Sequence, residues 1–266
     1  MTAATFLLEL RRSRSLTAWL VIVGLAYGGL IAVFYPTISS NSAVVDQYLA
    51  LFPREMIAAF GLEGSLADPG IFFNTYIGSL LWPILATIGA VLIATRSAAD
   101  LDRGWIELPL STPIPRTRYL GALIAAQLVA LAILAAATTG GVLVLGLLVG
   151  APFEAGHFAL ATLLAFAFGC AVASVATLLA VVTLSRGTAG GIAAGIVIAM
   201  YLFEVVARIE PDLAGLGSLS AFHYLEFVPV IDSGALPSTD LAVFGAVSLV
   251  SWLLAVLVFR GRDLVA

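Results

Sequence analysis

The chain has 266 residues, of which 61% are hydrophobic and only 11% are charged, with a mean hydropathy of +1.10. In a soluble globular domain about a quarter of the residues are charged, so this composition excludes that class and predicts an integral membrane protein. The single cysteine, Cys170, excludes an internal disulfide and a cysteine-based metal cluster. The basic residues are twelve arginines without a lysine, so the chain lacks a lysine-containing phosphate loop.

The N-terminus combines an apolar face with a basic end. In the segment 2–14, Phe6, Leu7 and Leu10 precede three arginines, which predicts a short interfacial helix. The apolar run 16–36 that follows is long enough to cross a bilayer. No small-residue cleavage site follows this run, so we expect an uncleaved first span rather than a signal peptide.

Further apolar stretches follow along the chain, and together they predict an all-α polytopic membrane protein with a single transmembrane domain, 1–266. The six expected transmembrane helices lie at about 16–36, 71–95, 119–149, 157–184, 188–206 and 239–259. The loop 36–70 carries apolar residues at helical spacing, which predicts a helix lying at the membrane surface. The other long loop is 207–238.

The arginines are distributed unevenly between the two sides of this arrangement. Ten of the twelve belong to the termini and to the loops on one side, whereas Arg54 and Arg208 belong to the two long, acidic loops on the other. The positive-inside rule therefore places both termini in the cytoplasm and the two long loops outside. The chain has no convincing internal repeat, which argues against an inverted-repeat secondary transporter.

One cytoplasmic loop, 96–118, is unusually rich in polar residues and prolines. Leu101 and Trp105 share one face of a predicted amphipathic helix, and Arg103 and Glu107 form an i,i+4 ion pair on the other. This pattern predicts a short helix at the membrane surface that docks on a partner. The alternative is a solvated loop that only sets the topology.

Ionisable side chains are nearly absent from the span interiors, and Glu204 in the fifth span is the one candidate. It can form an interfacial ion pair with Arg208 at i,i+4, or it can contact a substrate. The two histidines, His157 and His223, are both expected near the outer surface, and no catalytic or metal-ligand spacing is present. We therefore expect neither an enzyme nor a bound metal or cofactor.

Small residues recur every four positions in two of the predicted spans. Gly187, Gly191 and Gly195 do so at the start of the fifth span. This spacing is typical of close helix packing, either within one chain or at a dimer interface.

Four pieces of the chain resemble the transmembrane permease subunit of type 2 ABC exporters, and they occur in the matching order. In the strongest piece, Asp100–Ala122, two acids flank one residue and are followed by Gly104, by Glu107 and by a Leu-Ser-Thr-Pro turn. Trp105 and Pro109 depart from the family pattern, which usually has threonine and leucine there. The other three pieces are Phe52–Phe73, Ser218–Pro229 and Phe259–Leu264.

The resemblance implies that 97–110 is a coupling helix that docks on a separate ABC ATP-binding subunit, which would hold the ATP and magnesium. The docking residues would be Asp100, Leu101, Asp102, Arg103, Gly104, Trp105 and Glu107. A second copy of the chain or a related permease would complete the transporter in the plasma membrane of a prokaryote, among membrane lipids and without nucleic acid. The loop 207–238 would carry re-entrant outer helices.

The implied function is ATP-driven export of a hydrophobic or amphiphilic substrate. Aromatic residues with a few polar groups suit an amphiphile, although aromatic residues near the ends of spans also serve as membrane anchors. The candidate substrate path comprises Phe73, Asn74, Tyr76, Phe203 and Glu204, and the candidate outer gate comprises Phe222, His223 and Tyr224. For these last three residues, simple packing is the alternative. The alternative function is a membrane-anchored, ABC-linked module that transmits force or signal to an outside partner.

Overall fold

The computed structural model describes residues 3–59, 62, 64–96, 98, 116–151 and 153–261. Within these ranges the chain is helical and contains no strand. Six stretches are long and apolar enough to cross a membrane: Thr5–Ser40, Pro69–Ala94, Thr117–Leu148, Ala155–Thr183, Arg186–Ile209 and Ser238–Gly261. The prediction of an all-α protein with six membrane-spanning helices is therefore confirmed.

Most of these spans correspond to single helices. The first is α1 (Ala3–Ser40), the third α8 (Arg116–Leu148), the fourth α9 (Ala155–Thr183), the fifth α10 (Arg186–Ile209) and the sixth α12 (Ser238–Gly261). The second span is composite and consists of α4 (Pro69–Phe73), the π-helix η1 (Asn74–Leu81) and α5 (Trp82–Ala94). The two long loops contain α2 (Ser42–Leu49) and α3 (Arg54–Ala59), and the 3₁₀ helix η2 (Pro211–Leu219) and α11 (Val228–Ser233).

Two local predictions differ from these helices. The expected interfacial segment 2–14 and the expected first span are both parts of α1, because the residues that join them include neither proline nor glycine to interrupt the helix. The single surface helix expected in 36–70 is instead divided into α2 and α3. Pro53 lies at this division, where its missing N–H group prevents a continuous helix.

Helix α9 is central to the bundle and contacts α5, α8, α10 and α12. Two buried polar contacts fix it. The indole Nε1 of Trp82 donates a hydrogen bond to the Ala165 carbonyl at 2.8 Å, and the amide of Gln127 donates one to Thr177 Oγ1 at 3.1 Å. Because a bilayer offers no water to these groups, such bonds between helices satisfy polar atoms that would otherwise be costly to bury.

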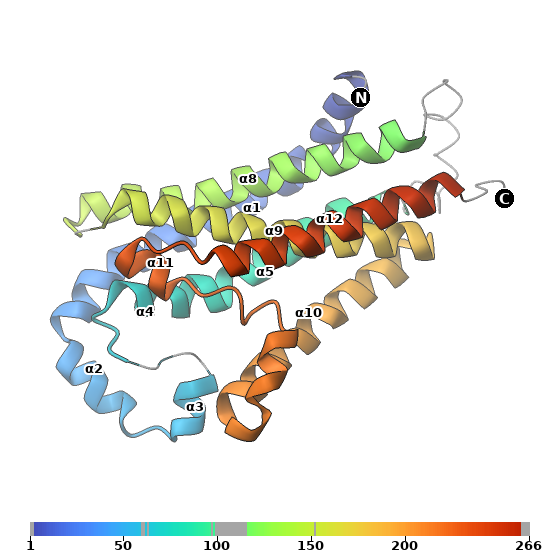
Figure 1. Ribbon diagram of the computed structural model, residues 1–266. Helices are drawn as coiled ribbons and strands as arrows, with labels where there is room; N and C mark the ends of the chain where they lie inside the picture. Colours follow the sequence, from blue (N-terminus) through green and yellow to red (C-terminus); the bar gives the residue numbers. More distant parts are fainter. Residues whose placement is uncertain are drawn as a thin grey trace.

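Figure 1 shows that both termini lie at the same end of the bundle. Helices α2, α3 and α11 lie at the opposite end. An aromatic cluster packs the core near that opposite end. Phe73 lies at its centre, with its ring 5.1 Å from the rings of both Phe153 and Phe158 and 5.9 Å from that of Tyr35. This cluster joins α1 and α4 to α9, so it fixes the start of the second span.

Helix α1 lies alongside α8 (Figure 1), and glycines bring the two backbones into contact. A Cβ atom added at Gly141 would overlap the Leu25 carbonyl oxygen, whereas one added at the adjacent Gly140 would meet nothing within 4 Å. Gly141 is therefore required for the close approach of the two helices, whereas Gly140 is not.

We predict that Gly141→Ala destabilises the protein by about 1–3 kcal/mol, because the added methyl group must push α1 away from α8. The adjacent Gly140→Ala is the control and should be neutral or stabilising by up to about 1 kcal/mol, since alanine favours helix and the position is open. Thermal unfolding of the two variants in the same detergent measures the difference. Equal melting temperatures would contradict the proposed close packing.

Candidate functional site

The candidate site is a groove between the second and fifth spans, and it begins with an irregularity in the second. The π-helix η1 occupies Asn74–Leu81, directly before α5, whose second residue is Pro83. Proline cannot donate a backbone hydrogen bond, so the α-helical bond to Ser79 is lost, which favours the wider turn before it. π-Helical segments are rare and frequently occur at functional sites.

Asn74, at the start of η1, faces the interior of the protein. It is 4% exposed, and its Oδ1 atom accepts a hydrogen bond at 3.0 Å from the backbone N–H group of Phe227. The ring of Phe227 lies so close to Gly78 that a Cβ atom there would overlap it. Asn74 therefore attaches the loop before α11 to the second span.

A cavity of about 250 Å³ lies between η1 and α10. Several polar side chains line it, among aromatic and aliphatic ones. Its lining residues are Leu62, Thr75, Tyr76, Gly78, Ser79, Leu80, Tyr201, Glu204, Val205, Arg208, Phe222 and Leu225. We call this space the polar cavity.

A second cavity of about 370 Å³ continues along α5 and α10. It shares Ser79, Leu80, Tyr201 and Phe222 with the polar cavity, and the rest of its lining is almost entirely apolar. Its other lining residues are Pro83, Ile84, Thr87, Ile88, Ala194, Val197 and Ile198. We call this space the apolar cavity. The two cavities together form a groove with a polar end and an apolar body, which suits an amphiphile.

The structure brings together only part of the predicted substrate path. Tyr76 and Glu204 both line the polar cavity. Phe73 and Asn74 instead are buried in the core, and Phe203 on α10 is 43% exposed and lines neither cavity.

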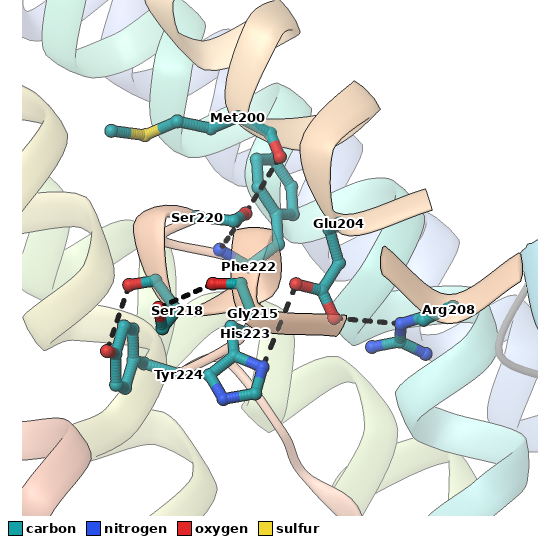
Figure 2. A network of polar contacts seen from close by, with 9 residues as sticks. All are labelled: Met200, Glu204, Arg208, Gly215, Ser218, Ser220, Phe222, His223 and Tyr224. Carbon is teal, nitrogen blue, oxygen red and sulfur yellow. Dashed lines mark hydrogen bonds and ion pairs between the residues drawn. The ribbon is translucent and has the colours of Figure 1, made fainter. Parts of the chain in front are cut away.

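Glu204 and Arg208 form the ion pair that their spacing suggests (Figure 2), with 2.9 Å between Arg208 Nε and Glu204 Oε1. Glu204 is only 7% exposed, and its second oxygen, Oε2, has no hydrogen-bond partner in the described part of the chain. The ring nitrogen Nδ1 of His223 lies 3.9 Å from Oε2, which is too long for a hydrogen bond. Leaving a buried oxygen unpaired costs about 1–3 kcal/mol or more when it is charged.

The predicted gate residues belong to a segment that is attached to α10, as Figure 2 shows. The Ser220 hydroxyl donates a hydrogen bond to the Met200 carbonyl at 2.8 Å and accepts one from the Phe222 N–H group at 3.1 Å. The Phe222 ring is thereby held 5.4 Å from Tyr201, where the two cavities meet.

The other two predicted gate residues lie farther from the groove. His223 has a half-exposed side chain and packs edge-on against Tyr224, with 5.2 Å between the rings. The Tyr224 hydroxyl donates to the Ser218 carbonyl at 3.0 Å. Neither side chain lines either cavity, so only Phe222 occupies a position that could separate one cavity from the other.

Sequence reasoning did not identify Arg208, Ser79 or Tyr201 as groove residues. A signal was present on α10, where Ala194, Ile198, Tyr201, Val205 and Arg208 recur every three or four positions and so share one face. The predicted docking residues, Asp100, Leu101, Asp102, Arg103, Gly104, Trp105 and Glu107, lie outside the described residues.

A pair of carboxyl groups lies where α11 meets α4. The Asp232 carboxyl group accepts a hydrogen bond from the Gly70 N–H group at 2.8 Å, and it also hydrogen-bonds to Asp68. Burial, together with the hydrogen bond and negative charge of Asp68, raises the pKa of Asp232 from 3.8 to about 6. The Gly70 N–H group and His157 oppose this rise only in part. No group of three or more metal-ligating side chains occurs among the residues that the structure describes.

Comparison with known families identifies the family of the chain. The family model described as "ABC-2 family transporter protein" matches residues 7–264 of the chain. No curated protein matches the chain.

The raised pKa of Asp232 predicts a pH-dependent stability. The folded protein binds the proton more tightly than the unfolded chain, so this contribution is fully present below the unfolded pKa near 3.8 and is lost as the pH rises through about 6. Asp232→Asn should remove this part of the pH dependence, because asparagine can still accept from Gly70 and donate to Asp68.

Thermal unfolding of the wild type and Asp232→Asn between pH 4 and pH 7 tests this prediction. The stability of the wild type relative to the variant should fall as the pH rises across this range. The exposed Asp212→Asn is the control and should follow the wild-type curve. Parallel curves for wild type and Asp232→Asn would show that the carboxyl pair does not share a proton.

Proposed function

Because the chain belongs to the ABC-2 family of transporter proteins and is thus the membrane-spanning permease subunit of an ABC transporter, we propose that it exports an amphiphile from a prokaryotic cell. A separate ATP-binding subunit would hydrolyse the ATP and hold the magnesium. The proposed route is the groove between the second and fifth spans.

The observation that carries this proposal is the change of character along the groove. Its polar end contains the Glu204–Arg208 ion pair, whereas its body is lined by aliphatic side chains of α5 and α10. An amphiphile needs both kinds of surface at once, because its polar group must keep hydrogen-bond partners while its hydrocarbon leaves the lipid.

We assign coupling to the segment 97–110. Helix α5 ends and α8 begins at the end of the bundle that also carries both termini (Figure 1). The excess of arginine on this side supports a cytoplasmic location. A cytoplasmic ATP-binding subunit that contacts 97–110 would therefore act directly on the ends of α5 and α8.

We assign the second permease subunit to the exposed side of α10. Gly187, Gly191 and Gly195 share one face of this helix, and a Cβ atom at any of them would meet nothing within 4 Å. A face of small residues that its own chain does not cover is suited to close packing with a helix of another subunit. This assignment supports a dimer of permeases, either two copies or two related chains.

We predict that Glu107→Lys and Asp102→Lys uncouple the ATP-binding subunit. Each change reverses a charge in the proposed docking segment, so capture of the ATP-binding subunit by the tagged permease should fall by about tenfold, as for a lost charge pair. Asp212→Lys, an exposed change in η2 at the other end of the bundle, is the control and should retain the partner. Normal capture by both docking variants would argue against this segment as the docking site.

We also predict that Ser79→Trp blocks the groove. Ser79 lines both cavities, so a large side chain there would fill the junction and abolish substrate-stimulated ATP hydrolysis, while the basal rate persists. Leu249→Trp, at a 61% exposed position on α12, is the control and should behave as the wild type. If no amphiphile stimulates the wild-type complex, the chain would instead be an ABC-linked module without a transported substrate.

A further inference from the structure

The polar cavity is lined by one negative and one positive side chain, and the ion pair between them leaves polar atoms of both without a partner in the part of the chain that the structure describes. Glu204 and Arg208 are joined through one oxygen and one nitrogen, Oε1 and Nε. In the described chain, Glu204 Oε2 makes no hydrogen bond, and the two terminal amino groups of Arg208 make none either. Both side chains line the polar cavity. The pair therefore keeps an unused hydrogen-bond acceptor and unused hydrogen-bond donors about one helical turn apart.

Glu204 is the stronger indication of a ligand. Its side chain is more than nine-tenths buried, and a buried carboxylate oxygen without a donor is rare in native proteins. The Nδ1 atom of His223, on a half-exposed side chain, is 3.9 Å away and does not hydrogen-bond to it. This oxygen is buried beside Gly217 and His223, so a donor that enters the polar cavity reaches it when the carboxylate turns toward that cavity, which Glu204 lines.

The net charge of the pair restricts the ligand. A purely anionic head group would be attracted by Arg208 but repelled by Glu204. A purely cationic head group would be attracted by Glu204 but repelled by Arg208. A zwitterion matches both groups, since its ammonium can donate to Glu204 Oε2 while its phosphate accepts from the terminal amino groups of Arg208. The rings of Tyr76 and Tyr201, which also line the cavity, are suited to contact the cationic part.

The rest of the groove identifies the remainder of the ligand. The apolar cavity begins at Ser79 and Tyr201 and continues between α5 and α10. A hydrocarbon chain attached to the head group would occupy this space. The acceptor at Glu204 further requires a donor on the cationic group, which a primary ammonium supplies and a quaternary ammonium does not.

We infer that the groove binds a zwitterionic phospholipid whose head group carries a primary amine next to a phosphate, as in phosphatidylethanolamine. Glu204 binds the ammonium, Arg208 binds the phosphate, and the apolar cavity holds an acyl chain. This inference rests on the proposed function, because it names the chemical class of the exported amphiphile.

The test is lipid retention by the purified full-length chain, without ATP or an ATP-binding subunit. The delipidated protein is offered an equimolar mixture of phosphatidylethanolamine, phosphatidylcholine and phosphatidylglycerol with identical acyl chains, and native mass spectrometry measures which lipid remains bound. We expect about tenfold enrichment of phosphatidylethanolamine, as for one charge-assisted hydrogen bond. Equal retention of the three lipids by the wild type would overturn the inference without any variant.

Two variants test the assigned roles. Glu204→Gln leaves Arg208 as the only charge in the pair, so the preference should change from phosphatidylethanolamine to the anionic phosphatidylglycerol. Arg208→Gln should lower retention of all three lipids, because each carries a phosphate. Glu210→Gln, an exposed change just after α10, is the matched control and should keep the wild-type preference. An unchanged preference in Glu204→Gln would overturn the role of the carboxylate.

Two further outcomes separate this inference from the proposed function. Displacement of the lipid by soluble glycerophosphoethanolamine at the same concentration would overturn the role of the apolar cavity. Selective retention of phosphatidylethanolamine without lipid-stimulated ATP hydrolysis by the assembled complex would support the head-group site and contradict export. Stimulation by an amphiphile of another class, without selective retention, would support export and contradict the head-group site.

Discussion

The arrangement of the groove depends on one hydrogen bond, from the Phe227 N–H group to Asn74 Oδ1. Both groups are buried, so neither can exchange this bond for water without exposing the core. The same outer segment is attached to α10 through Ser220 and the Met200 carbonyl. Because it is fixed to both spans, the segment holds Phe222 between the two cavities. A relative movement of the second and fifth spans would therefore strain one of these two attachments.

The spans were predictable because each is a long apolar stretch, and a backbone inside a bilayer must satisfy its own hydrogen bonds. The groove was not predictable from the sequence, because it depends on the π-helix η1. In a regular α-helix Phe73 and Tyr76 lie on adjacent positions of one face, yet Phe73 packs in the aromatic cluster and Tyr76 lines the polar cavity. Composition does not reveal where a helix widens, so a prediction based on aromatic residues beside a polar group assigned both residues to the same path.

The chemistry of the site was likewise predictable only in part. The i,i+4 spacing of Glu204 and Arg208 was sufficient to suggest their ion pair, which the structure contains. The burial of Glu204 was not predictable, since it depends on residues that follow in η2 and the outer segment. Gly217, for example, lies close to the Glu204 carboxylate, and an added Cβ atom would be 3.6 Å from Oε2. Such contacts determine how much of an ion pair remains available to a ligand.

The close contact between α1 and α8 also bears on how the chain is assembled in the membrane. During synthesis α1 enters the bilayer before α8 exists, so the surface that later meets Gly141 is first surrounded by lipid. In the two-stage view of membrane-protein folding, helices insert independently and associate afterwards. The first span must therefore remain stable as a lone helix until the third has inserted. Its length and high hydropathy meet this requirement, and biogenesis thus constrains a helix that lines neither cavity of the groove.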